Sequence, residues 1–209
     1  PAVGLGLMLA ISHGLAVLGA FGWFGVNGGR VVAGVPIIGG LLLLAGDLLR
    51  RQSGSSVSLS PAVLAFVPAV ALLVVASASP PGWLWASEGF GYDTRSYHMQ
   101  LPAEWLADGR LWPAEHNVYS FLPGYVEAAF YHLVAIVGEH PADGAGVGVL
   151  AGQCLSALMA MLAAVLIARV CWLVVPQERR QAASTLAIGM GALALGTPWV
   201  LVVGSLAYN

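Results

Sequence analysis

Residues Gly146–Val175 read GVGVLAGQCLSALMAMLAAVLIARVCWLVV, an apolar run in which Arg169 is the one charged side chain. A transmembrane helix needs about 20 predominantly apolar residues, so this run is long enough to cross a bilayer. Four further runs meet the same requirement. We therefore predict an all-α fold: a polytopic membrane helix bundle with about five spans, which form a single transmembrane domain over residues 1–209. The other four spans are Ala2–Val26, Val31–Leu49, Leu59–Ser79 and Ala182–Ala207.

The composition argues against a soluble protein. Hydrophobic residues make up 58% of the chain and charged residues 9%, whereas soluble domains carry about 25% charged residues. All eight cations are arginines and the net charge is −2, so the basic footprint of a nucleic-acid-binding protein is missing.

The two cysteines are not expected to form a disulfide. Cys154 and Cys171 lie about 25 Å apart on one predicted helix, which is too far for a disulfide bond, and we expect both thiols to be buried. The chain runs from Pro1 to Asn209 and stops directly after an apolar run, which favours a segment of a longer protein.

Arginine placement predicts the orientation of the spans, because cytoplasmic loops are enriched in Lys and Arg. Pairs of arginines follow the second and fourth spans, at Arg50-Arg51 and Arg179-Arg180. With both pairs in the cytoplasm, the loop over residues 80–145 lies on the outer side of the membrane. In this arrangement the shorter apolar run Phe121–Val137 does not cross the membrane. We expect it to form an interfacial or half-inserted helix near the outer face.

The ionisable residues gather in this outer loop. Eight of the ten Asp and Glu residues and four of the five histidines lie between Glu88 and Asp143. Within the loop, Gly91–Arg110 reads GYDTRSYHMQLPAEWLADGR. We predict a helix over Thr94–Leu101 with Asp93 or Thr94 as its N-cap. A bend at Pro102 and a short second helix over Ala103–Ala107 should follow.

Helical spacing divides these side chains between two faces. Tyr97, Leu101 and Trp105 share one face, which we expect to rest on the membrane surface, where Tyr and Trp rings are favoured. Arg95, His98 and Glu104 then point toward water or a cavity. For His98, a substrate contact and an ordinary surface histidine are equally open, whereas Glu104 is more simply a solvated helix residue.

Two interpretations are open for Asp93. It either caps the helix or stands at the membrane boundary as a general base that removes a proton from an attacking hydroxyl. Glu127 and His132 are similarly open. They lie in an apolar helix that should touch the bilayer, where ionisable groups indicate function by default, although groups near the interface reach water by snorkelling.

Two stretches of the loop carry a family resemblance: the run from Tyr92-Asp93 through Tyr97-His98 and Glu104-Trp105 to Gly109, and the run Phe121-Leu-Pro-Gly-Tyr125. Together they resemble the first outer loop of the GT-C-type membrane glycosyltransferases. They are most similar to the bacterial branch related to the aminoarabinose and mannosyl transferases, which implies a bacterial inner membrane with the loop over residues 80–145 on the periplasmic side. The resemblance covers about fifty residues, and the rest of the chain agrees in topology. Where the superfamily has a second acidic element, this chain has Ala207-Tyr208-Asn209.

The resemblance implies a reaction and a set of roles. Asp93 would be the catalytic base, and the donor would be a sugar linked to polyprenyl phosphate. Arg95 and Arg110 would neutralise the leaving phosphate, since the guanidinium fork suits phosphate. Tyr97, His98 and Glu104 would complete the substrate-binding set. No cofactor is expected. A divalent cation held by Asp93 with His98 or His116 is the less favoured alternative.

The expected partners are a lipid-linked sugar, membrane lipids and other membrane proteins, but no nucleic acid. A second function stays open beside the transferase. The chain would then be a non-catalytic membrane subunit whose outer loop docks on partner proteins in a larger complex. A secondary transporter ranks last, because it needs polar groups at the membrane midplane and the predicted spans hold few.

Overall fold

A computed structural model describes residues 2–23, 25–51, 60–81, 83–85, 91–137 and 146–208. Pro1, Asn209 and the parts of the predicted outer loop at 82, 86–90 and 138–145 therefore lie outside the described residues. Every regular element in the described ranges is helical, which confirms the all-α prediction. The chain divides into two compact units. Unit 1 comprises Pro1–Ser58 with Ser96–Gly148, and unit 2 comprises Leu59–Arg95 with Val149–Asn209.

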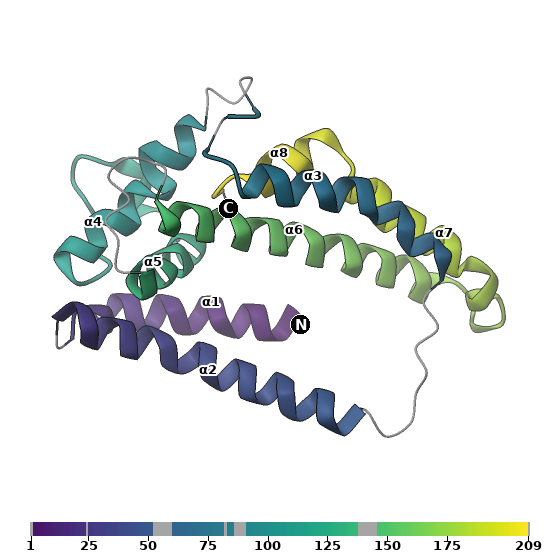
Figure 1. The fold of residues 1–209 in the computed structure, drawn as a ribbon, viewed down its shortest axis with the longest axis horizontal. Helices are drawn as coiled ribbons and strands as arrows, with labels where there is room; N and C mark the ends of the chain where they lie inside the picture. The colour runs from purple at the N-terminus through teal and green to yellow at the C-terminus, as the bar shows by residue number, and fades with distance from the viewer. Residues whose placement is uncertain are drawn as a thin grey trace. The chain divides into compact units, whose positions relative to one another are not determined.

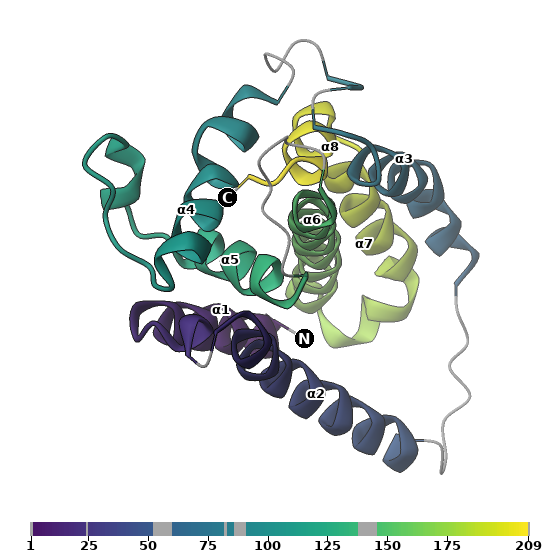
Figure 2. The same ribbon diagram turned by 60° about the vertical axis from the view of Figure 1, so that its left-hand side comes forward.

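Unit 1 is built around a short helix that three others enclose. Helix α5 (Tyr125–Val137) packs against α1 (Ala2–Val17), α2 (Gly25–Arg51) and α4 (Gln100–Asp108), as Figures 1 and 2 show. Its middle is fully buried: Ala128, Phe130 and Tyr131 are all 0% exposed. Two 3-10 turns complete the unit, η1 (Ala20–Gly22) and η5 (Val118–Phe121). The core also takes in Ala16, Phe21, Ala33, Leu101, Trp105 and Ala135.

Glycines decide where the first helix ends. Gly19 adopts a left-handed conformation with φ of 70° and Gly25 one of 73°, which suits residues without a Cβ. The chain therefore turns between α1 and α2, and the predicted span Ala2–Val26 ends at Val17 as a helix. At this turn Gly22 lies against Gly109: a Cβ on Gly22 would come within 2.8 Å of the Gly109 carbonyl oxygen. The backbone N–H of Leu111 donates to the Ala16 carbonyl, 2.9 Å away, so the end of α4 is fixed to the end of α1.

Unit 2 contains the longest helix, α6 (Val147–Val174), whose residues from Val149 onward belong to this unit. The 3-10 turn η2 (Pro61–Phe66), α3 (Val67–Ser77), η6 (Gln177–Arg179), α7 (Arg180–Leu195) and α8 (Pro198–Ser205) complete it. Small residues let α6, α7 and α8 approach closely, as is common between membrane helices. A Cβ on Gly191 would meet Ala164 of α6, and one on Gly204 would meet Ala160. Leu73, Leu195 and Leu201 fill the core between them.

Polar side chains close the ends of the unit 2 helices. The buried amide of Gln153 donates to the carbonyls of Ser77 and Ser79, at 2.9 and 2.8 Å, and so satisfies carbonyls that the end of α3 leaves unpaired. The Trp85 indole N–H donates to the Ser205 hydroxyl at 2.7 Å. These bonds hold the ends of α3 and α8 to their neighbours.

The described helices meet the membrane-span prediction only in part. Helix α6 is long and apolar enough to cross a bilayer, and only 11% of its most apolar window is buried. The segment Gln177–Leu195 with α8 would add a second span if the pair, bent by 61°, counts as one. Three other apolar helical stretches are shorter than a span requires: Val3–Val17 in α1, Asn27–Leu42 within α2, and Pro61–Ser77 over η2 and α3. Five spans are therefore not confirmed. Cys154 is exposed on α6, contrary to the expected burial, and Cys171 is half-buried.

Candidate functional site

The helix predicted from Thr94 begins earlier than the sequence indicated: Tyr92 and Asp93 are already helical, and a π-helical turn follows them. The N–H of Arg95 donates to the Gly91 carbonyl at 3.2 Å, which makes Gly91 the cap, because the cap's carbonyl accepts the first bond of a helix. Neither Asp93 nor Thr94 is therefore the N-cap, contrary to prediction. Thr94–His98 then form the π-helix η4. Single π-helical turns are rare and occur frequently at functional sites.

The break in this region falls at Met99 rather than at Pro102. Met99 separates η4 from α4, which starts at Gln100. Pro102 lies in the first turn of α4, where the missing N–H removes no helical hydrogen bond. The predicted helices Thr94–Leu101 and Ala103–Ala107 are thus replaced by η4 and α4. At the other end Gly109 adopts φ of 76° and terminates α4.

His98 and Glu127 form a buried pair inside unit 1. The His98 Nδ1 and the Glu127 Oε1 are 2.9 Å apart, and the two residues are only 3% and 5% exposed. The Nδ1–H donates to the carboxylate, which fixes the tautomer and the orientation of the imidazole. The pair joins the last residue of η4 to the first turn of α5. Acidic side chains are almost never buried this deeply unless they are paired.

The ring of Tyr97 contacts the His98 ring at a tilt of 42° and stacks on the ring of Tyr119. The Tyr97 ring centroid lies 4.1 Å from that of His98 and 4.0 Å from that of Tyr119, with only 14° between the two tyrosine planes. Tyr119 belongs to η5, so the aromatic stack links η4 to the loop that precedes α5.

The predicted membrane-facing surface of the loop is wrong. Leu101 and Trp105 are only 1% and 2% exposed, because both side chains pack into the unit 1 core beside Tyr131. The Trp105 indole N–H donates to the Trp112 carbonyl at 2.9 Å. Tyr97 is partly buried and packs against the same core, and its ring also contacts those of His98 and Tyr119.

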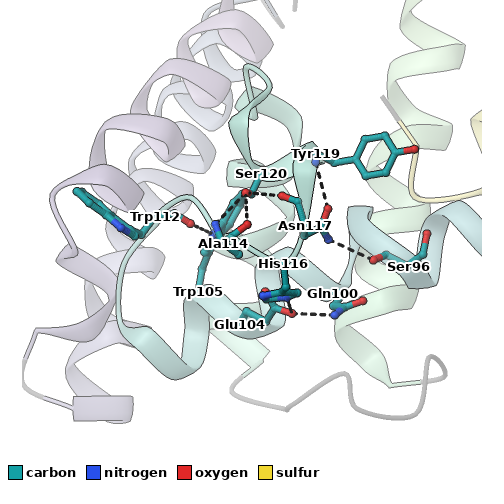
Figure 3. A network of polar contacts seen from close by, with 10 residues as sticks. All are labelled: Ser96, Gln100, Glu104, Trp105, Trp112, Ala114, His116, Asn117, Tyr119 and Ser120. Atoms are coloured by element: carbon teal, nitrogen blue, oxygen red, sulfur yellow. Dashed lines mark hydrogen bonds and ion pairs between the residues drawn. The ribbon is translucent and has the colours of Figure 1, made fainter.

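Glu104 holds the loop after α4 in place (Figure 3). Its Oε1 accepts hydrogen bonds from the Gln100 amide at 2.8 Å and from the His116 Nε2 at 3.1 Å. The Ser120 hydroxyl accepts from the Ala114 N–H at 2.8 Å and donates to the Asn117 carbonyl at 2.7 Å. Glu104 is therefore engaged with protein partners and orders the loop that carries Tyr119.

The remaining predicted residues are less enclosed. Asp93 is half-buried, directly ahead of η4, while Arg95 is exposed. Both belong to unit 2, whereas Tyr97, His98, Glu104 and Arg110 belong to unit 1. Arg110 is exposed and its guanidinium lies 4.6 Å from the centre of the Trp112 ring. Of the predicted set, the structure brings Tyr97 and His98 together, and it adds Glu127 and Tyr119.

A second buried histidine ties three helices of unit 1 together. His132, 0% exposed, has its Nδ1 2.8 Å from the Ser12 hydroxyl on α1 and its Nε2 2.6 Å from the Ala33 carbonyl on α2. A carbonyl only accepts, so Nε2 carries the proton and the Ser12 hydroxyl donates to Nδ1. Burial lowers the pKa of His132, and the bond to Ala33 opposes that shift.

Glu127 and His132 therefore do not touch the bilayer as expected. Helix α5 is enclosed by protein, and its ionisable groups are satisfied by protein partners. The neighbouring phenol is also affected: burial, followed by the charge of Asp108, raises the pKa of Tyr131 to about 12. The sequence signal for these residues was their position in an apolar helix. Nothing in the sequence indicated Tyr119, whose role depends on the loop conformation.

Within the part of the chain that the structure describes, no three His, Cys, Asp or Glu side chains gather as metal ligands would. Asp93, His98 and His116 accordingly form no such group. No family model, curated protein or solved structure matches this chain. The similarity to the GT-C transferases thus stays a resemblance.

Proposed function

We propose that this chain is part of a polytopic membrane glycosyltransferase, which moves a sugar from a polyprenyl-phosphate donor to an acceptor at the outer membrane face. Asp93 is its general base. The exposed apolar surface of α6 supports membrane residence, and the helices and hydrogen bonds of residues 91–137 support a built site rather than a solvated linker.

The observation that carries the proposal is the placement of Asp93. It is half-buried and lies directly ahead of a π-helical turn, and Gly91 rather than Asp93 caps that helix. Asp93 therefore lies within the first helical turn and does not occupy the N-cap position. The turn itself is fixed at its far end by the His98–Glu127 pair. A catalytic group needs such support from its neighbours to hold its geometry.

The reaction would be a single displacement. The acceptor hydroxyl gives its proton to the Asp93 carboxylate while its oxygen bonds to the anomeric carbon. The bond from that carbon to the phosphate oxygen breaks, and polyprenyl phosphate leaves with the electron pair, so the sugar is transferred with inversion. Arg95 and Arg110 are exposed and offer cationic forks for the leaving phosphate.

The Asp93→Asn variant of the full-length protein tests the role of the base. General-base catalysis contributes about 10²–10⁴-fold, so transfer of a labelled sugar from polyprenyl phosphate should fall by about that factor. The Asp108→Asn variant is the matched control, since it removes an exposed carboxylate from the same loop. Both proteins should remain in the membrane fraction after alkaline extraction.

Unchanged transfer by Asp93→Asn would overturn the mechanism. A different result would distinguish the non-catalytic subunit from the transferase. If purified full-length protein transfers none of a panel of polyprenyl-linked sugars but co-purifies stoichiometrically with another membrane protein, the non-catalytic subunit is the better description.

A further inference from the structure

The segment before α5 exposes an unusual density of large apolar side chains. Val118 is 72% exposed, Phe121 62% and Leu122 61%, while Tyr119 and Tyr125 are about half exposed, at 47% and 50%. The run Val118–Tyr125 reads VYSFLPGY and contains no charged residue. Contiguous exposed apolar patches mark sites that contact another molecule or a membrane.

The same segment satisfies much of its own backbone. The N–H of Tyr119 donates to the Asn117 side-chain oxygen at 3.1 Å. The N–H groups of Ser120 and Leu122 donate to the carbonyls of Asn117 and Tyr119, at 3.0 and 3.1 Å. A segment that enters a lipid environment must pair its polar backbone groups internally, since hydrocarbon offers no hydrogen bonds.

The residues shortly before this run in the sequence have the chemistry of a membrane interface. Trp112 is 58% exposed and carries the exposed guanidinium of Arg110 against its ring. Tyr and Trp rings are enriched at the headgroup level, and an arginine beside them faces anionic headgroups. The acidic neighbour Glu115 stands outside the uncharged run.

We propose that Val118–Tyr125 is a lipid-anchoring loop, which inserts Val118, Phe121 and Leu122 into the interfacial layer of the bilayer. It anchors the loop that bears Tyr119, the outer ring of the stack on Tyr97 and His98. Lipid contact thus lies on this uncharged loop and not on the Leu101–Trp105 face. The inference rests on membrane residence but not on sugar transfer.

Site-directed spin labelling of the full chain tests it. In a background with Cys154→Ser and Cys171→Ser, single cysteines replace Phe121 or Leu122 and carry a nitroxide. The protein is placed in nanodiscs of phosphatidylcholine and phosphatidylglycerol, and accessibility to oxygen and to a water-soluble nickel chelate is measured. Glu115→Cys is the matched control in the same loop, exposed but polar. Val165→Cys, 57% exposed on α6, reports the hydrocarbon.

Oxygen should reach the labels at positions 121 and 122, and the nickel chelate should not. Their depth parameter should therefore have the same sign as that of the label at position 165 and the opposite sign to that of the label at position 115. Nickel access equal to that of Glu115, with Val165 in hydrocarbon, would overturn the loop inference and leave the proposed function standing. Protection from both reagents would overturn it in favour of a protein covering. Nickel access at all four positions would overturn membrane residence, and both proposals with it.

Discussion

At the residue scale, the unit 1 interior holds an ionisable pair where apolar side chains would pack as well. Burying two ionisable side chains is costly, and an apolar pair of similar size is often as stable. His98 and Glu127 nevertheless meet at 2.9 Å in a nearly solvent-free position. A buried pair of this kind is weak evidence for a gain in stability. The better explanation for the pair is that it fixes the orientation of η4 against α5.

A comparison of single and double variants tests this pair. His98→Leu should lower the free energy of unfolding by about 3–5 kcal/mol, because it removes one member of a buried hydrogen-bonded pair. The double variant His98→Leu/Glu127→Leu should recover much of that loss. Thermal unfolding in detergent measures both. His116→Leu is the control: this histidine also pairs with a glutamate but is 64% exposed, and exposed pairs contribute about 0–1 kcal/mol. Equal costs at His98 and His116 would contradict the buried-pair interpretation.

His132 should make the protein less stable in acid. Its pKa is lowered on folding from the ordinary value of 6.5, so the unfolded chain takes up a proton before the folded one does. The stability linked to the neutral ring is therefore complete above about pH 6.5 and declines as pH falls toward the folded pKa. His132→Gln should flatten the fall in melting temperature between neutral and mildly acid pH. An identical pH dependence in the variant would show that protonation occurs elsewhere.

At the element scale, apolar length predicted helices well and their ends poorly. Gly146–Val175 coincides with α6 (Val147–Val174) to within a residue at each end, because nothing in that run competes with a helix. The predicted span Ala182–Ala207 instead breaks after Leu195, where Gly196 and the Pro198 N-terminus of α8 separate two helices. Likewise Leu59–Ser79 starts as the 3-10 turn η2 before α3. These breaks follow from local glycine and proline chemistry, which a hydropathy window averages away.

The candidate site was predictable where residues are adjacent in the chain and not where the fold joins them. Tyr97 and His98 are neighbours, and their ring contact follows from that. The pairing of His98 with Glu127 joins residues 29 positions apart and depends on how α5 packs. Helical spacing also placed Trp105 on a membrane-facing surface. It could not show that α4 packs against α5, which buries Trp105 in the core of unit 1.

Helix packing in unit 2 offers a matched pair of glycines on α7. A Cβ at Gly191 would lie 2.6 Å from the Ala164 carbonyl oxygen and 2.9 Å from the Ala168 Cβ, whereas Gly189 has nothing within 4 Å. Gly191→Ala should therefore lower stability by about 1–3 kcal/mol, as overpacking does. Gly189→Ala should raise it by about 0.5–1 kcal/mol, since alanine favours the helix. Thermal unfolding of both variants checks this, and a neutral Gly191→Ala would mean that α6 and α7 do not pack so closely.

At the scale of the whole molecule, the cations and aromatic rings of unit 2 form a boundary at one end of α6. Arg169 and Arg180 lie 4.4 and 4.9 Å from the Trp172 ring centre. Arg180 also donates to the carbonyls of Val175 and Leu173, at 3.1 and 3.3 Å, so it satisfies groups that the helix end leaves open. Cations are favoured at helix C-termini, and arginine with tryptophan is typical of the membrane–water interface. This end is where we expect α6 to leave the bilayer on its cytoplasmic side.

Chemical labelling of the membrane-embedded chain tests that orientation. With Cys154 and Cys171 replaced by serine, single cysteines are placed at Ala107 in α4 and at Glu178 after α6, both exposed. A membrane-impermeant maleimide should label position 107 in intact spheroplasts and position 178 only after lysis, because the proposed orientation has both arginine pairs in the cytoplasm. A cysteine at Val165 should resist labelling in both conditions, since the thiolate needed for reaction does not form in hydrocarbon. Labelling of position 178 from outside would reverse the topology and move Asp93 to the cytoplasmic face. Polyprenyl-linked donors used at the outer face would then no longer reach it.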